Sequence, residues 1–384
     1  MNELELLKEL EKLRRSKDLY YVEHKEASEE EVKRVINEAC EELYKKALQL
    51  SELDDGSRHL LAGTALNIKE DYDKRCEESL ATAVRLLPLN AQSWSELAQC
   101  VWKKDNISFA VYLLTRSVEV TRTSRGLSLL SLAMRATLSS LSVEEAAMTR
   151  RKALDIAREA VELDSSCGES WMTLGNALLS TFFAEGQKRE EDLKECMACY
   201  EKAVALGIVS SDLHINWATG LRYNCLFTEA LTHLQKAVDI ERSRRNKTLY
   251  TEMAVILKKI ERTAIGIKNT RKDLEGRDRV SGRIVEVVSP SSFTPCILLL
   301  DSPSDGPFIC CLFNFSSSMS FLVGDSLTIK HPQLLEFSSN GLSFPLVRLL
   351  SPFSLLRNGS RIRESSLAFA NVSIHNKSTL KQHK

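Results

Sequence analysis

Long apolar segments are missing from this chain of 384 residues, and so is an excess of charge of either sign. A membrane-spanning helix needs about 20 apolar residues in succession, and no comparable run occurs. Lys+Arg and Asp+Glu both total 52, which argues against nucleic-acid binding over the whole surface. The first residues, MNELELLKELEKLRRSK, are charged and predicted to be helical, unlike a secretory signal. We therefore expect an intracellular protein with reduced thiols.

Motifs for catalysis and nucleotide binding are missing as well. The sequence contains no G-x-G-x-x-G, G-x-x-x-x-G-K-S/T, G-x-S-x-G or H-E-x-x-H, and its seven histidines form no catalytic pattern. Cys196 and Cys199 are spaced as C-x-x-C, but a zinc site needs a second ligand pair, and none stands near them. We therefore predict no enzyme, no cofactor and no metal site.

Proline is scarce in the first three quarters of the chain, where Pro88 is the one example among eight prolines in all. This part is rich in Ala, Leu, Glu and Lys and is predicted to be helical. From about residue 279, short apolar runs separated by Pro, Gly and Ser predict strands. Such a length also exceeds one ordinary core. The predicted divisions are N-terminal capping helices at 1–56, a repeat array at 57–265, a basic linker at 266–278, a barrel at 279–357 and a disordered tail at 358–384.

The helical part contains an internal repeat. Segments that begin with Trp94, Trp171 and His214 each open a helix with a large residue and place a small residue four positions later. A second helix follows each, and its small residues are spaced by 34, 43, 43 and 34 positions; they are Ala83, Ser117, Ala160, Ala203 and Ala237. A helix–turn–helix period of 34 is typical of tetratricopeptide repeats, and the longer spacings equal one repeat plus nine inserted residues, one insertion following Leu178. An irregular helical bundle is the alternative.

Stacked repeats of this kind form a right-handed superhelix whose concave groove usually holds an extended peptide. The small residues let the two helices of a repeat approach closely, and the large ones fill the gap to the next repeat. The array is therefore interpreted as a peptide-binding module. His214 occupies the position of a repeat Trp and is interpreted as a packing residue.

The C-terminal part is predicted to be a small all-β barrel. Strands are expected at 279–289, 296–301, 307–314, 325–330 and about 342–356, with a helix-compatible segment, SSSMSFL, between the third and the fourth. This layout favours an oligonucleotide/oligosaccharide-binding (OB) fold, and an SH3-like barrel is the alternative. Phe308, Phe313 and Phe315 are expected in the core rather than as a base-stacking platform. Cys310 and Cys311 are adjacent on a strand, so we expect them to face opposite sides as buried apolar residues.

The ordered set of these features resembles one family. The matching segments are ALN at 65–67, WKK at 102–104, SWMTLGNALLS from Ser170, DLHIN at 212–216, and FICCLFN at 308–314 followed by VGDSLTI. Together with a barrel after the repeats, they resemble the tetratricopeptide repeat protein 5 family, also called Strap, over about 57–357. The chain is interpreted as a divergent member.

The resemblance implies a cytoplasmic and nuclear adaptor. Proteins of this family recognise the first residues of nascent tubulin, Met-Arg-Glu followed by Ile or Cys, at the ribosome and trigger decay of tubulin mRNA. They are also implicated in stress-responsive transcription with an acetyltransferase coactivator, which is the alternative function. By resemblance, Arg135 provides the groove cation, and Asp212 provides the carboxylate for the peptide arginine, with Asn216 one helical turn further on the same face. Asn176 is the candidate clamp for the peptide backbone.

The chain also departs from the family. Asn246 stands where an acidic residue is expected, which weakens the site for the peptide arginine unless Glu252 replaces it. The linker is shorter and less rich in Lys than in the family. Residues 242–279 still hold 12 Lys/Arg against 5 Asp/Glu. Candidates for contact with ribosomal RNA phosphates are Lys258, Lys259, Arg262, Lys268, Arg271 and Lys272.

Each candidate also has an ordinary structural interpretation. Arg135 can cap or pair with a neighbouring helix, Asp212 can be the N-cap of its helix, and the basic stretch can be a solvated face. A second hypothesis, from another class, is nucleic-acid binding through the barrel and the basic linker, although the barrel strands are poor in cations and in Tyr and Trp.

Overall fold

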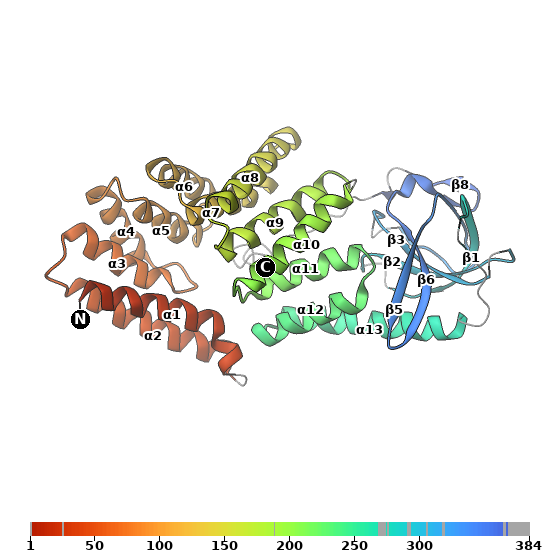
Figure 1. Ribbon diagram of the computed structural model, residues 1–384, viewed down its shortest axis with the longest axis horizontal. Helices are drawn as coiled ribbons and strands as arrows, with labels where there is room; N and C mark the ends of the chain where they lie inside the picture. The colour runs from red at the N-terminus through yellow and green to blue at the C-terminus, as the bar shows by residue number, and fades with distance from the viewer. Residues whose placement is uncertain are drawn as a thin grey trace.

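The computed structural model describes residues 2–24, 27–187, 189–267, 274, 276–289, 293–304, 306–316, 319–363 and 366–367. Helices come first and strands follow, with the sheet domain at one end of the molecule (Figure 1). The helices are α1 (Glu3–Glu23), α2 (Glu29–Leu48), α3 (Asp55–Asn67), α4 (Lys74–Leu86), α5 (Ala91–Trp102), α6 (Ile107–Val120), α7 (Ser124–Ala136), η1 (Leu138–Ser140), α8 (Val143–Leu163), α9 (Gly168–Ala184), α10 (Glu190–Ala205), α11 (Ser211–Tyr223), α12 (Phe227–Ile240) and α13 (Arg244–Ile267).

Consecutive helices pack in pairs, α3 with α4, α5 with α6 and so on to α11 with α12, and α1 and α2 form a further hairpin at the start. The small residues predicted at the second-helix positions are all buried: Ala83, Ser117, Ala160, Ala203 and Ala237. They let the paired helices approach closely, as the repeat pattern requires. The tetratricopeptide-repeat array expected from the sequence is therefore the fold of the helical part.

The large residues that open the first helices occupy equivalent positions. The indole nitrogen Nε1 of Trp94 donates to the Pro88 carbonyl at 2.9 Å, and Nε1 of Trp171 donates to the Ser165 carbonyl at 2.9 Å. Each bond ties a first helix to the loop before it, at a carbonyl six positions before the tryptophan. The repeats of Trp94 and Trp171 differ in length but share this local geometry, which explains why the sequence pattern recurs.

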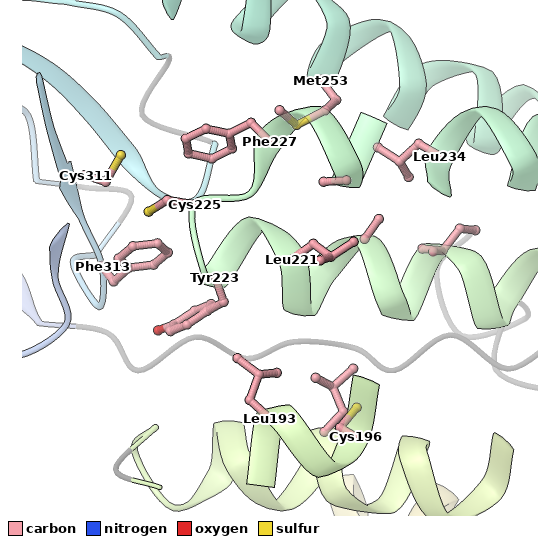
Figure 2. Packing of buried hydrophobic residues seen from close by; sticks show 14 of the residues in the cluster. Leu193, Cys196, Leu221, Tyr223, Cys225, Phe227, Leu234, Met253, Cys311 and Phe313 are labelled. Carbon is pink, nitrogen blue, oxygen red and sulfur yellow. The ribbon is translucent and has the colours of Figure 1, made fainter. Parts of the chain in front are cut away.

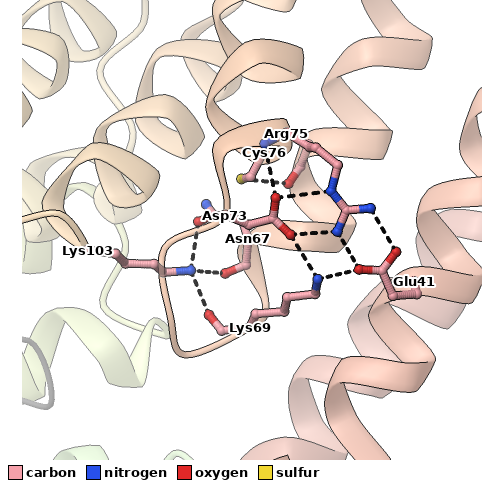
Figure 3. Close-up of polar contacts among 8 residues, drawn as sticks. Glu41, Asn67, Lys69, Asp73, Arg75, Cys76 and Lys103 are labelled. Carbon is pink, nitrogen blue, oxygen red and sulfur yellow. Dashed lines mark hydrogen bonds and ion pairs between the residues drawn. The ribbon is translucent and has the colours of Figure 1, made fainter. Parts of the chain in front are cut away.

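A network of ion pairs attaches the α1–α2 hairpin to the first full repeat (Figure 3). Arg75 donates to Glu41 of α2 at 3.0 Å and to Asp73 at 2.8 Å, and Lys69 donates to Asp73 at 2.9 Å. The hydrogen bond from Arg75 is the main reason that the pKa of Glu41 is lowered to about 2. The hairpin therefore caps the array through charge as well as through its apolar side chains.

The strands are β1 (Arg279–Val287), β2 (Cys296–Asp301), β3 (Phe308–Leu312), β4 (Ser326–Lys330), β5 (Gln333–Ser339), β6 (Leu342–Leu349), β7 (Leu355–Arg357) and β8 (Ser360–Arg361), with a 3-10 turn η2 at Pro352–Ser354. They form one sheet in the order β5-β6-β3-β2-β1-β4-β7-β8. β1 pairs with both β2 and β4, and β3 pairs with β6 in parallel. This topology is the OB fold, as expected.

Several details of the barrel differ from the prediction. The sequence predicts no strand at β5, because QLLEFSS lacks regular alternation and the turn before it is made by His331 in place of the usual Gly or Asn. The strand expected at about 342–356 is divided by η2 into β6 and β7. The helix expected from SSSMSFL is not found, since Ser316 and residues 319–322, the part of this segment that is described, are not helical.

The expected disordered tail starts too early. Ser360–Arg361 forms β8 against β7, and Leu367 bridges Phe315, so the barrel extends past residue 357. Residues 368–384 lie outside the described part. No helix in the described ranges is long and apolar enough to cross a membrane.

One apolar core runs from the array into the barrel (Figure 2). Tyr223 and Phe227, at the junction of α11 and α12, lie beside Cys311 and Phe313 of the barrel, and the rings of Tyr223 and Phe313 are 4.4 Å apart. Cys310 faces the barrel interior, whereas Cys311 faces the array. The prediction that these two cysteines point to opposite sides is confirmed.

Candidate functional site

The last turn of α7 holds the predicted groove cation, Arg135. Its side chain is buried, 8% exposed, and neither Nε nor Nη2 has a hydrogen-bond partner among the described residues. Burial lowers the pKa of this guanidinium to about 10, so it still carries its charge at neutral pH. The ordinary interpretation, a cap or an ion pair with a neighbouring helix, is not what the structure shows.

A second buried charge on the first helices shows the contrast. Glu96 of α5 is 2% exposed, and it accepts hydrogen bonds from Arg14 at 2.6 Å and from Asn67 at 2.8 Å. A buried charge is normally stabilised by such partners, because desolvation of an isolated ion costs several kcal/mol. Arg135 has no equivalent of Glu96 in the described part of the chain, which makes it the better candidate for pairing with a ligand anion.

Two of the other predicted site residues meet each other, and Tyr200 connects them to Arg135. Asn176 of α9 accepts a hydrogen bond from the Asn216 amide of α11 at 2.9 Å and another from the Tyr200 hydroxyl of α10 at 2.8 Å, all on the Asn176 Oδ1 atom. Arg135 and Tyr200 are close enough that each affects the other's pKa. These four residues, Arg135, Asn176, Tyr200 and Asn216, are called the polar cluster below.

A glycine makes room for this arrangement. A Cβ atom at Gly175 would lie 2.7 Å from Cε1 of Tyr200, closer than side chains pack. The same geometry occurs at the first repeat, where Gly63 faces Leu80. Tyr200 thus takes the place that an apolar residue has in another repeat, and its hydroxyl reaches Asn176. The L-G-N segment is therefore explained by a close approach of α10 to α9.

Asp212 lies in the first turn of α11, one turn before Asn216, and is half-buried. The N-cap of this helix is Ser210, whose Oγ accepts from the Leu213 amide at 3.3 Å, so the alternative that Asp212 is the cap is wrong. The carboxylate and the Asn216 amide share a helical face, as positions i and i+4 do.

His214, between these two residues, packs as expected. It stacks on Trp217, and its Nδ1 lies 3.0 Å from Nδ1 of His233 on α12. Burial lowers the pKa of both imidazoles to about 4, so both are neutral at pH 7 and share one hydrogen bond. The pair joins the two helices of this repeat.

Asn246, the departure from the family, has a structural function. Its side-chain amide donates to the carbonyls of Glu241 at 2.9 Å and of Ala237 at 3.3 Å, and thereby binds the last turn of α12. A carboxylate there has no proton to donate to these carbonyls. Glu252, suggested as its replacement, is exposed on α13. Its negative charge partly offsets the lowering of the Arg222 pKa by burial.

The basic residues fall into two groups. Lys258, Lys259 and Arg262 are exposed on α13, whereas Lys268, Arg271 and Lys272 lie outside the described residues. The structure therefore places a short basic stripe on the helix that leads to the barrel. Its contact with phosphates stays a prediction.

The cysteines of the C-x-x-C pair are buried in α10. The Cys196 thiol donates to the Gly175 carbonyl at 3.2 Å, and burial raises the pKa of Cys199 to about 12. Both sulfur atoms therefore remain protonated and serve the contact between α9 and α10. No group of three or more potential metal ligands occurs among the residues with a described placement.

The insertion after Leu178 holds the barrel. Phe183 in the extended end of α9 packs against Tyr223 at 4.9 Å. Gln187 accepts a hydrogen bond from Asn314 of the barrel, and Glu190 forms an ion pair with Arg348 of β6. Sequence reasoning missed these interface residues because their partners are more than 120 positions away in the chain.

The face of β2 and β3 on which OB folds usually bind ligands is used for this interface. Its outward residues belong to the core shared with the array; they are Ile297, Ile309, Cys311, Phe344 and Leu346, the last two on the adjoining strand β6. A nucleic acid therefore cannot reach this face without separating the two parts. The hypothesis of binding on the usual OB surface is disfavoured by this packing.

Fold and site together define a tetratricopeptide-repeat adaptor for protein interaction with a C-terminal OB-fold barrel. A family model described as Tetratricopeptide repeat protein 5 OB fold domain matches residues 261–371. Tetratricopeptide repeat protein 5 of Bos taurus is 27% identical, and that of Homo sapiens 26% identical, with 96% of this chain and 96% of each relative covered. The resemblance to this family is confirmed, at 26–27% identity.

Two solved structures are similar to part of this chain. TTC0263 of Thermus thermophilus is 15% identical, with a TM-score of 0.41, and the match covers 58% of this chain and 98% of that one. PilF of Pseudomonas aeruginosa is 12% identical, with a TM-score of 0.41, and the match covers 64% of this chain and 98% of that one.

Proposed function

We propose that the chain is a non-catalytic adaptor that binds the N-terminal Met-Arg-Glu-Ile or Met-Arg-Glu-Cys segment of nascent tubulin at the ribosome and promotes decay of tubulin mRNA. The observation that carries the proposal is the buried guanidinium of Arg135, whose Nε and Nη2 have no partner in the described chain, near Tyr200, whose hydroxyl donates to Asn176. A peptide carboxylate that pairs with this guanidinium gains a charge-assisted, bidentate contact. The relatives named above support the assignment.

Each group of the peptide has a suitable counterpart. The peptide glutamate matches Arg135, and the peptide arginine matches the carboxylate of Asp212. Oδ1 of Asn176 is already occupied by two donors, and no bond from its amide nitrogen is described, so this nitrogen suits a peptide carbonyl. Because stacked repeats present their first helices on a concave surface, an extended peptide can contact α7, α9 and α11 in succession.

The proposal places the protein in the cytoplasm during translation, with the exposed cations of α13 near ribosomal phosphates. The nucleus and the transcription coactivator are the alternative. In that case the polar cluster would read an acidic or mixed-charge segment of a coactivator with the same chemistry.

The test is a titration of a labelled Met-Arg-Glu-Ile peptide with the full chain. We expect Arg135→Glu and Asp212→Lys each to weaken binding by at least about 30-fold, because truncating or reversing one partner of a buried charge pair costs about 2–5 kcal/mol. Arg151→Glu, at an exposed position of α8, makes the same charge change as Arg135→Glu and should leave binding unaltered.

A charge-reversed peptide separates pairing from misfolding. Met-Arg-Lys-Ile should bind Arg135→Glu better than wild type, since the new carboxylate then meets a cation. Failure of folded wild-type protein to bind Met-Arg-Glu-Ile would refute the proposal and favour the coactivator alternative.

A further inference from the structure

Cations that are scattered in the sequence of the barrel come together on one face of its sheet. Along β1, Arg279 and Arg283 are exposed, while Val280, Gly282 and Ile284 point into the barrel. Lys330 of β4 is directly opposite Arg279, and Arg361 of β8 continues the same face through Leu356. These four cations, Arg279, Arg283, Lys330 and Arg361, are called the basic sheet face.

The charges on this face are not neutralised within the protein. No ion pair involving any of the four cations is found among the described residues. Asp301, opposite Arg283 on β2, is the one carboxylate in register with them in the described strands. Arg357, in contrast, is paired with Asp325 at 2.6 Å and is not counted.

The pairing of Arg279 with Lys330 is unfavourable for the fold itself, because like charges directly opposite each other on neighbouring strands repel. Between the cations, the hydroxyls of Ser281 and Thr328 meet at 3.0 Å. The face thus offers positive charge and hydroxyl groups about 13 Å along β1 and about 5 Å across to β4. Such a surface suits a polyanion with regularly spaced phosphates.

We propose that the basic sheet face binds the backbone of double-stranded RNA. Outward-facing residues described for β1, β4, β7 and β8 include no aromatic side chain, so single-stranded bases have no stacking platform. The described part of this face also has no helix to enter the major groove of DNA. The wide, shallow minor groove of A-form RNA exposes phosphates for the cations and 2′-hydroxyls for the Ser281 and Thr328 hydroxyls of this face.

The position of this face leaves it accessible. β1 and β8 lie at the end of the molecule away from the helices, whereas β5 and β6 adjoin α13 (Figure 1). The site is therefore distinct from the buried β2–β3 surface, from the α13 stripe and from the polar cluster. It is independent of the proposed function.

The test measures anisotropy of a labelled RNA duplex of about 20 base pairs with the full chain at about 50 to 200 mM salt. We expect Arg279→Gln/Lys330→Gln to reduce the steepness of the salt dependence by about 1.8 in log–log slope, and the affinity near 0.1 M salt by roughly 60-fold, if both cations contact phosphates. Arg151→Gln/Lys152→Gln, at exposed positions of α8, changes the net charge equally and serves as the control.

Peptide binding, thermal unfolding and binding of other polyanions distinguish RNA binding from misfolding and from general anion binding. The double variant should keep Met-Arg-Glu-Ile binding unchanged and should melt no earlier than wild type, since the repulsive pair is removed. Equal loss in the control, no RNA binding by wild type, or unaltered RNA binding by the double variant would overturn the proposal. Equal binding of a DNA duplex or of polyglutamate, with the same sensitivity to the double variant, would also overturn it and show a general anion surface instead.

Discussion

Arg348 gives the sharpest test of how the barrel is attached to the array. Its side chain, 5% exposed, donates to Gln333 at 3.0 Å and to Asn224 at 3.1 Å, and it pairs with Glu190. It thus bridges β5, the α11–α12 loop and the insertion. Replacing Arg348 by Met keeps most of the apolar stem and removes the charge.

The expected cost is large for a single substitution. The substitution removes charged hydrogen bonds that contribute about 1.5–3 kcal/mol each, and we expect a net cost of about 2–3 kcal/mol because the Glu190 carboxylate left without its partner is 41% exposed. The matched control is Arg122→Met. Arg122 also makes two bonds to one carboxylate, Glu159, at 2.7 and 2.6 Å, but its side chain is 61% exposed. Exposed pairs contribute about 0.2–1 kcal/mol.

The assay is urea unfolding of both variants, followed by tryptophan fluorescence for the array and by far-ultraviolet circular dichroism for the whole chain. All four tryptophans lie in the array, at 94, 102, 171 and 217. Arg348→Met should lower the midpoint and separate the two signals, because the barrel then unfolds before the array. The reasoning is refuted if Arg348→Met costs no more than Arg122→Met while the signals still coincide.

Two further predictions concern the array. Gly175→Ala should destabilise the protein by about 1–3 kcal/mol, because the new Cβ would lie 2.7 Å from Tyr200. It should also weaken peptide binding, because the Tyr200 hydroxyl would be displaced from Asn176. The control is Gly266→Ala, whose Cβ would meet nothing within 4 Å. For His214 and His233, whose pKa is lowered to about 4 in the fold, the unfolding free energy should be full above pH 6.5 and fall toward pH 4, by up to about 1.4 kcal/mol per pH unit for each. His233→Gln should flatten this fall, and an unchanged pH profile would contradict the neutral pair.

The repeat period predicted the helices of the array and, with the resemblance, the residues that now lie together. Asn176 and Asn216 are 40 positions apart, yet their side chains meet because each lies on the first helix of its repeat. Tyr200 could not be found this way. It sits on a second helix, where the pattern expects a core residue such as Leu80, and no local signal separates a buried tyrosine that bonds across helices from one that only packs.

The sequence predicts most strands of the barrel, but it does not predict how they pair or which outer face the array covers. Alternation of apolar and polar residues identifies strands, but it does not show which outer face will be covered. Ile297 and Ile309 are apolar, as barrel-core residues would be, yet they form the surface on which the array packs. The cations Arg279 and Lys330 are far apart in the sequence, and the strand register alone makes them neighbours.

The shared core also bears on how two ligands would act together. Since the array and the barrel are joined through Tyr223, Phe313 and Arg348, the distance between the polar cluster and the basic sheet face is fixed by the fold rather than by a flexible linker. When one ligand is bound to the polar cluster, the basic sheet face is held at a defined distance from it. The effective concentration of a second, linked ligand therefore rises only if its geometry matches that distance. A peptide that emerges at the wrong distance from a bound RNA gains nothing. Because the barrel is held rigidly through the insertion, simultaneous binding of both ligands would depend on the distance between them.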